Sequence, residues 1–227
     1  MLSLRRRLAF TATALCVAAT TLVAPPAHAE RINVLIVGDS VASVLRWAPE
    51  SMKPLWGTTY NATLEVWGCQ KLLDKGCIDS ARLSALDQIV KHRKDNIDIV
   101  VIATGYNDTG AEYVRKAIRK INAEVKSQGA TLMWLTYREN GNVKVKNRAF
   151  NDVVKSESKK LRFTLLDWEL IARKNKHWFT GDRVHMNKFG GLQLARHIKM
   201  ALDIKYGFAK ATTTTTTLVA TTTTFPS

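Results

Sequence analysis

The stretch from Ile32 to Ser40 constrains the fold of this chain more than any other part of the sequence. Six mostly aliphatic residues run directly into the turn Gly38-Asp39-Ser40, and the next seven residues are typical of a helix start. An uninterrupted apolar run of this kind is typical of a strand buried on both faces of a parallel sheet. Ser40 is therefore expected at the carboxyl end of that strand, where open α/β sheets bind ligands and free helix N–H groups favour an anion. A serine in this position is a candidate nucleophile. The alternative is that Asp39 or Ser40 only caps the helix.

The first 29 residues have the layout of a secretory leader. Three consecutive arginines, Arg5 to Arg7, precede an apolar segment, and Ala27-His28-Ala29 matches a small-residue cleavage site. The apolar segment is short and ends at this cleavage site, so we expect export and removal of the leader, not a membrane span. The mature chain would begin at Glu30, and Cys16 would be lost with the leader.

The mature chain is strongly basic. Its net charge is +12 once the three leader arginines are subtracted from the +15 of the full sequence. Such a charge favours contact with anionic wall polymers or lipid head groups, although it also serves general solubility. Nucleic acid is not expected as a partner, because the basic residues are spread along helices without a nucleic-acid-binding motif.

Two cysteines remain after cleavage, Cys69 and Cys77. An oxidising compartment favours a disulfide between them, and their spacing does not suit zinc, which needs paired cysteines and further ligands. We expect neither a metal nor a cofactor in this protein.

Apolar strand patterns alternate with helical patterns along residues 30–210. The expected strands are 32–37, 62–67, 97–104, 131–136 and 163–166, and the expected helices are 80–95, 111–128, 146–160 and 188–206. Alternation of this kind predicts a three-layer α/β/α sandwich around a five-stranded parallel sheet. From Ala211 the sequence is dominated by threonine, and such a segment buries too little apolar surface to fold. A glycosylated spacer, a linker remnant and an inert tail remain alternatives for residues 211–227.

Three of the expected strands end in residues that suit acyl transfer. The strands lead to Ser40, to Gly68 and to Asn107, and parallel strands place all three ends on one edge of the sheet. An attacking hydroxyl needs hydrogen-bond donors for the oxyanion that forms. The backbone N–H of Ser40, the N–H of Gly68 and the amide of Asn107 are the candidates, and glycine lets the backbone approach a substrate closely.

The base is sought among the four histidines of the mature chain, which are His92, His177, His185 and His197. Only His185 has an acid three residues before it, in Asp182-Arg183-Val184-His185. This spacing lets the Asp182 carboxylate accept the Nδ1–H of the imidazole and leaves Nε2 free to take a proton from serine. An isolated Asp-x-x-His is more often an ordinary loop. His92 and His197 are expected to be structural or solvated.

Taken together, these residues resemble the conserved blocks of the SGNH (GDSL-type) hydrolase family. Its four blocks are matched in order by Gly38-Asp39-Ser40, by Gly68, by Gly105-Tyr106-Asn107-Asp108 and by Asp182-Arg183-Val184-His185. The resemblance spans about residues 32–202 and implies a flavodoxin-like sheet and Ser-His-Asp chemistry on esters. It implies that Ser40 is the nucleophile, His185 the base and Asp182 the orienting acid, with Ser40, Gly68 and Asn107 forming the oxyanion hole.

The form Gly-Asp-Ser-Val and the short chain look most like exported SGNH domains associated with membrane acyltransferases that modify cell-wall sugars. We expect no multi-span membrane half like theirs in this chain. The first expectation is therefore a secreted esterase for short acyl groups, plausible on carbohydrate or wall polymer. An O-acyltransferase with a separate membrane donor and a catalytically silent wall-binding domain are the alternatives. Four aromatic residues flank the blocks as candidates for a sugar platform, an acyl pocket or core packing: Trp67, Tyr106, Trp178 and Phe179.

Overall fold

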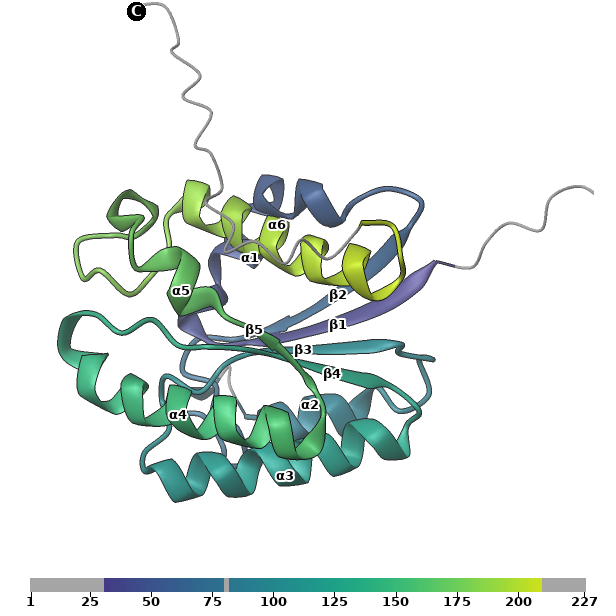
Figure 1. The fold of residues 1–227 in the computed structure, drawn as a ribbon, viewed down its shortest axis with the longest axis horizontal. Helices are drawn as coiled ribbons and strands as arrows, with labels where there is room; N and C mark the ends of the chain where they lie inside the picture. Colours follow the sequence, from purple (N-terminus) through teal and green to yellow (C-terminus); the bar gives the residue numbers. More distant parts are fainter. Residues whose placement is uncertain (1–30, 80–81, 210–227) are drawn as a thin grey trace, which may run out of the picture. The chain divides into compact units, whose positions relative to one another are not determined.

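The computed structural model describes residues 31–79 and 82–209 (Figure 1). The expected leader and the threonine-rich segment lie outside these ranges. A five-stranded sheet, with all its strands parallel, forms the centre of the described part in the order β2-β1-β3-β4-β5. This arrangement confirms the predicted fold class.

The sheet places its most apolar strands in the middle. β1 (Ile32–Gly38) pairs with β2 (Tyr60–Val66) on one side and with β3 (Ile99–Ala103) on the other, and β4 (Thr131–Leu135) and β5 (Thr164–Leu166) follow. The register sets Gly38 opposite both Val66 and Ala103. The ends of β1, β2 and β3 therefore lie level at one edge of the sheet, which is where the candidate blocks begin.

Helices cover both faces of the sheet (Figure 1). On one face lie α2 (Ala85–Lys91), α3 (Ala111–Ser127) and α4 (Lys144–Leu161). On the other lie α1 (Val44–Trp47), α5 (Trp168–Ala172) and α6 (Lys188–Lys205). Each face has its own hydrophobic cluster, because residues that alternate along a strand point to opposite sides of the sheet: Val34 and Ile36 belong to one cluster, Leu35 and Val37 to the other. Short 3₁₀ helices are η1 (Ser40–Ala42), η2 (Pro49–Leu55), η4 (Gly141–Val143) and η5 (Lys176–Trp178).

One predicted helix is shorter than expected. The helix expected over residues 80–95 is α2, which begins only at Ala85. Ser84 is its N-cap, because its hydroxyl accepts the N–H of Asp87 while the Asp87 carboxylate accepts the N–H of Ser84. Leu83, within the range expected for this helix, precedes the observed helix and is exposed. Ser80, the first residue of the expected range, lies outside the described residues.

Candidate active site

Ser40 lies immediately beyond the end of β1, at the first position of η1. The turn is tight: a Cβ on Gly38 would lie 2.9 Å from the Cβ of Ala42, so a larger residue there would displace the turn. Ser40 is partly exposed, whereas Val41 and Ala42 after it are buried. The local packing therefore fixes the backbone and leaves the serine hydroxyl accessible at the sheet edge.

Asp39 is buried and joins two of the four blocks. Its carboxylate accepts the N–H of Val41 at 3.0 Å, so it does cap η1. It also accepts the N–H groups of Gly105 and Tyr106, both at 3.0 Å. Burial raises the pKa of Asp39, and the N–H donors act against that rise. The sequence indicated the capping role, but the link to the turn after β3 appears only in the structure.

The loop before α6 brings His185 to Ser40. The Nε2 atom of His185 lies 2.9 Å from Oγ of Ser40, and its Nδ1 lies 2.5 Å from Oδ2 of Asp182. The side chains of His185 and Asp182 are 44% and 49% exposed, so this end of the site is open. The three side chains form a continuous hydrogen-bonded chain from a carboxylate through an imidazole to a hydroxyl.

Asp182 is held by its own loop as well as by His185. Its Oδ1 accepts the N–H groups of Val184 and His185 at 2.9 and 3.0 Å and the hydroxyl of Thr180 at 2.9 Å. Partial burial raises the pKa of Asp182, but these donors and the His185 imidazole outweigh burial, so the pKa lies well below its usual range. Asp182 is therefore ionised and oriented across the ordinary pH range.

The three candidate oxyanion donors lie on loops that leave adjacent strands. In the described part of the chain, the backbone N–H groups of Ser40 and Gly68 donate to no other protein group. The side-chain amide of Asn107 donates one hydrogen bond to the carbonyl of Gln70 at 3.1 Å. An amide has two N–H donors, so this bond orients Asn107 and leaves the second donor for another acceptor.

The loop after β2 is attached to the turn after β3 at several points. The carbonyl of Gln70 accepts the hydroxyl of Thr104 at 3.2 Å as well as the amide of Asn107. The buried carboxylate of Asp108 accepts the N–H of Leu72 at 3.1 Å. A disulfide between Cys69 and Cys77 closes the same loop directly after Gly68. The segment directly after Gly68 is therefore held by a disulfide and by hydrogen bonds to the turn after β3.

Lys146 of α4 holds the turn that carries Asn107. Its Nζ donates to the carbonyls of Tyr106 at 2.5 Å and Asp108 at 3.3 Å, the residues on either side of Asn107. Burial lowers the pKa of Lys146, and the nearby carboxylates of Asp108 and Asp39 act against that decrease. Sequence reasoning missed this residue, because a lysine in a basic helix gives no signal of where its side chain points.

Arg138 connects the same turn to the histidine loop. Its backbone N–H donates to the hydroxyl of Tyr106 at 2.7 Å, and its Nε donates to the carbonyl of Arg183 at 3.3 Å. The buried guanidinium lies 4.1 Å from the centre of the Phe179 ring. Arg183 has a positive φ of 64°, so the carbonyl that Arg138 holds belongs to the strained residue between Asp182 and His185.

The remaining histidines lie away from Ser40. His92 is buried, with Nε2 at 2.9 Å from Glu65 and Nδ1 at 2.6 Å from Asp95. His197 is half-buried on α6 beside Trp168, and the burial of its ring lowers its pKa to about 4. His177 is exposed and lies against Phe189.

The four flanking aromatic residues have different roles. Trp178 and Phe179 are buried, and their ring centres lie 5.6 and 6.4 Å from that of Trp168, so these two residues belong to the core. Tyr106 is half-buried and packs edge-on against Tyr137. Trp67 is also half-buried: it lies beside Gly68, and the guanidinium of Arg46 lies 4.2 Å from the centre of its ring.

A small apolar hollow of about 10 Å³ adjoins the turn that carries Ser40. Val41 and Ala42 of that turn line it, together with Tyr106 and with Met186 of the histidine loop. Among the described residues, no group of three His, Cys, Asp or Glu side chains is arranged to hold a metal ion. None of the helices in residues 31–79 and 82–209 is long and apolar enough to cross a membrane.

Comparison with known proteins identifies the class of fold. No protein-family model matches the chain, and no curated protein matches it either. Among solved structures, TesA superposes with a TM-score of 0.61 at 17% identity, covering 75% of this chain and 97% of its own. The acetyl xylan esterase AlAXEase gives a TM-score of 0.57 at 18% identity, with coverages of 75% and 100%. A member of the lipolytic G-D-S-L family from Veillonella parvula gives 0.58 at 14%, with coverages of 76% and 97%.

The chain therefore has the fold of the SGNH (GDSL-type) hydrolases and esterases. At these low identities the likeness concerns the fold. What the side chains of this protein do must be inferred from its own site.

Proposed function

We propose that this protein is a secreted serine ester hydrolase that acts through an acyl-enzyme intermediate. The observation that carries the proposal is the hydrogen-bonded triad of Asp182, His185 and Ser40. Nδ1 of His185 lies 2.5 Å from Oδ2 of Asp182, and its Nε2 lies 2.9 Å from Oγ of Ser40. Asp182 accepts the Nδ1–H of His185 and so leaves the lone pair of Nε2 directed at the Ser40 hydroxyl. A nucleophile, a base and an orienting acid in this geometry are what acyl transfer requires.

The reaction begins when Oγ of Ser40 attacks the ester carbonyl carbon while Nε2 of His185 takes its proton. The carbonyl oxygen becomes an oxyanion, which receives hydrogen bonds from the N–H groups of Ser40 and Gly68 and the free amide N–H of Asn107. The bond to the alcohol then breaks, and His185 gives its proton to the leaving oxygen. Water attacks the acyl-Ser40 with His185 as base again, and the released acid leaves Ser40 reprotonated.

The substrate class we propose is a short acyl ester, acetyl-like, on carbohydrate or cell-wall polymer. Trp67 offers a half-buried ring beside Gly68 for a sugar. One structural neighbour is an acetyl xylan esterase, which is consistent with this class. The exposed Asp182 and His185 leave that side of the site open to water, which favours hydrolysis over transfer to a sugar. Export past the cytoplasmic membrane is part of the same proposal and rests on the leader-like first 29 residues.

The test is the cleavage of an aryl acetate by the purified protein. Ser40→Ala and His185→Ala are expected to abolish turnover, because each removes a reacting group. Ser127→Ala and His177→Ala are matched controls, since both side chains are exposed and, among the described residues, neither forms a hydrogen bond with Ser40, Asp182 or His185. Turnover by His185→Ala at the wild-type rate would contradict the assignment of the base. The silent wall-binding alternative would be favoured by either of two results: the wild type does not cleave the aryl acetate, or both active-site variants cleave it as fast as the wild type.

Hydrolysis and transfer share the acyl-Ser40 intermediate and differ in the group that attacks it. An activated acetyl ester supplied together with wall oligosaccharides distinguishes the two activities by product. We expect free acetate to dominate. Acetylated sugar as the main product at millimolar acceptor would instead show an O-acyltransferase that works with a separate acyl donor.

A further inference from the structure

Arg46 on α1 is an exposed cation at the edge of the sheet that carries the candidate active site. Its Nη1 donates to the carbonyl of Val66 at 3.1 Å. Val66 is the last residue of β2 and lies opposite Gly38, the last residue of β1. The backbone N–H of Trp67 donates to the carbonyl of Gly38 at 3.0 Å. The guanidinium is therefore anchored where β1 and β2 end, at the same edge as the proposed nucleophile.

The guanidinium of Arg46 lies against a ring that is itself held in place. Its Cζ lies 4.2 Å from the centre of the Trp67 ring. The indole Nε1–H of Trp67 donates to Oε2 of Glu65 at 2.9 Å. Glu65 is buried, and its Oε1 also accepts the ammonium of Lys91 at 2.7 Å. These contacts hold the guanidinium in position before a ligand binds, so less conformational entropy is lost on binding.

Most of the donors of Arg46 have no partner in the protein. A guanidinium has five N–H donors, and in residues 31–79 and 82–209 only the hydrogen bond to Val66 uses one of them. Nε and Nη2, which together form one fork of the guanidinium, donate to no described group. The carboxylate of Glu65 pairs with Lys91 and His92 instead. The positive charge of Arg46 is therefore not neutralised by an ion pair within the described ranges.

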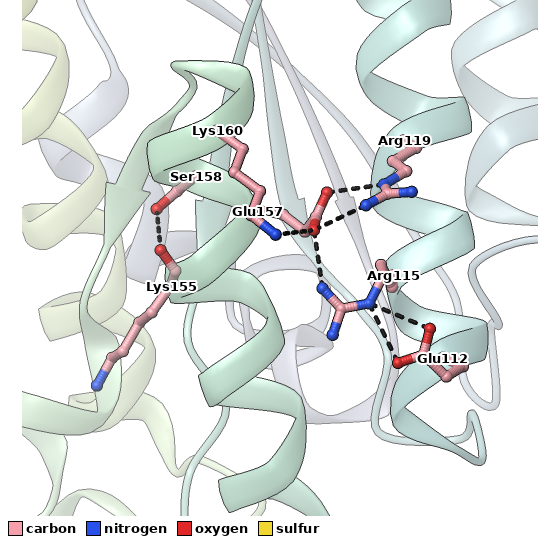
Figure 2. Close-up of polar contacts among 7 residues, drawn as sticks. All are labelled: Glu112, Arg115, Arg119, Lys155, Glu157, Ser158 and Lys160. Carbon is pink, nitrogen blue, oxygen red and sulfur yellow. Dashed lines mark hydrogen bonds and ion pairs between the residues drawn. The ribbon is translucent and has the colours of Figure 1, made fainter.

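Arg46 differs in this respect from the arginines between α3 and α4 (Figure 2). Arg115 and Arg119 donate to the buried carboxylate of Glu157 at 2.8 and 2.9 Å. The N–H groups of those two arginines are thus engaged within the protein. The free fork of Arg46 is available to an acceptor that arrives from solvent, and it lies at the edge of the sheet where a substrate would bind.

We propose that Arg46 is a specificity-determining residue that binds an oxyanionic group, a carboxylate or a phosphate, on the alcohol part of the ester. This inference rests on the proposed esterase function and narrows its substrate class to short acyl esters of anionic sugars or wall polymers. The negative group belongs to the alcohol part, because an acetyl-like acyl group carries no charge. A planar guanidinium fork binds a carboxylate or a phosphate through two parallel hydrogen bonds.

The experiment compares the hydrolysis of aryl acetates that differ in one charged substituent. The meta- and para-acetoxybenzoates carry a carboxylate, para-acetoxyphenyl phosphate carries a phosphate, and the acetoxybenzamides are neutral. For Arg46→Gln we expect kcat/KM for an anionic ester to fall about tenfold relative to that for the neutral esters, because charge-assisted hydrogen bonds are lost. Arg46→Lys should keep part of the preference. Arg196→Gln removes an exposed guanidinium from α6 and is the matched control.

The specificity role can fail while the esterase proposal holds. If Arg46→Gln slowed the neutral and the anionic esters equally, the residue would only support the end of β2, and the specificity role would be overturned. If Arg196→Gln reduced the preference for anionic esters as much as Arg46→Gln, net charge alone would be responsible, and the role would be overturned as well. The carboxylate and phosphate esters show which anion Arg46 binds.

A binding measurement tests the role of Arg46 without hydrolysis. If the wild type cleaved none of the esters, the esterase proposal would fail, and binding of para-acetamidobenzoate would decide the present one. This amide resembles the ester and resists hydrolysis. It should bind the wild type about tenfold more tightly than it binds Arg46→Gln, whereas neutral para-acetamidobenzamide should show no such difference. Equal affinity of the anionic amide for both proteins would contradict the assignment of Arg46.

Discussion

The ammonium of Lys146 donates to the carbonyl of Tyr106 at 2.5 Å and thereby fixes the residue that precedes Asn107. It reaches the turn from α4, 40 residues away in sequence. The proposed oxyanion donor is thus held from one side by Gln70 and from the other by a lysine of a different element.

Replacing Lys146 tests whether this contact positions Asn107 for the reaction. Lys146→Met should lower kcat about tenfold with little change in KM, because a small displacement of a donor weakens the transition state more than the bound substrate. Lys146→Arg should restore part of the loss. Lys144→Met, on the same helix and exposed, is the control. An unchanged kcat in Lys146→Met, with the fold intact by circular dichroism, would contradict the positioning role.

The orienting role of Asp182 predicts a partial loss of activity. Asp182→Asn keeps the size of the side chain but removes the negative charge that accepts the Nδ1–H of His185 at 2.5 Å. We expect kcat to fall by about 10³–10⁴-fold while some turnover persists. Steady-state kinetics on the aryl acetate measure this, with the exposed Asp152→Asn as control. A loss below tenfold would mean that His185 does not need Asp182.

Asp108 predicts a specific dependence of stability on pH. Burial raises its pKa from 3.8 to about 7, against the hydrogen bond from Leu72. The folded protein therefore retains a proton that the unfolded chain loses between about pH 4 and 7, so this group's contribution to stability falls as pH rises through that window. Asp108→Asn keeps an oxygen acceptor for Leu72 and cannot titrate. Denaturant unfolding of both proteins from pH 4 to 8 should show the wild type losing stability relative to the variant. If the free energies of unfolding of the wild type and the variant changed in parallel with pH, the raised pKa of Asp108 would be contradicted.

For Glu157 we expect stability to fall as the pH is lowered, which is the opposite of the trend expected for Asp108 (Figure 2). The hydrogen bonds from Arg119, followed by those from Arg115, hold its pKa down at about 2 against the effect of burial. The stabilisation is present above the unfolded pKa of 4.5 and is lost as pH falls towards 2. Wild type should therefore lose more stability than Glu157→Gln between pH 5 and 2. Glu112→Gln, whose carboxylate is 83% exposed, should behave like the wild type.

The disulfide predicts a change in both stability and rate. Cys69→Ser/Cys77→Ser is expected to lower the free energy of unfolding by about 2–3 kcal/mol, because the cross-link closes a short loop. It should also lower kcat, since the bridge begins directly after Gly68. Mass spectrometry of the non-reduced protein should find the two cysteines cross-linked. A reductant that slows the wild type must leave the double variant unaffected; equal slowing of both would place the effect elsewhere.

The sequence alone determined the sheet and the order of its blocks. Apolar runs such as Val34–Val37 cannot be exposed to water, so strands, their burial and the parallel α/β topology follow from local patterns. The level ends of β1, β2 and β3 then bring Ser40, Gly68 and Asn107 to one edge without further information. The Asp-x-x-His spacing likewise limits Asp182 to a position beside His185. The start of α2 differs from the expected one, because the capping box between Ser84 and Asp87 begins this helix at Ala85 and apolar spacing alone does not locate that cap.

The tertiary structure decided which distant side chains hold the site in place. Whether His185 approaches Ser40 depends on the path of a loop 145 residues away, and no local propensity specifies that path. The same holds for Lys146 against Tyr106, for Arg138 against Arg183, and for Asp39 bonding to the turn after β3. These contacts join surfaces that come together only when helices and loops pack. The energy of each contact depends on how deeply its groups are buried and on the direction of its hydrogen bond, and neither property can be read from neighbouring residues in the sequence.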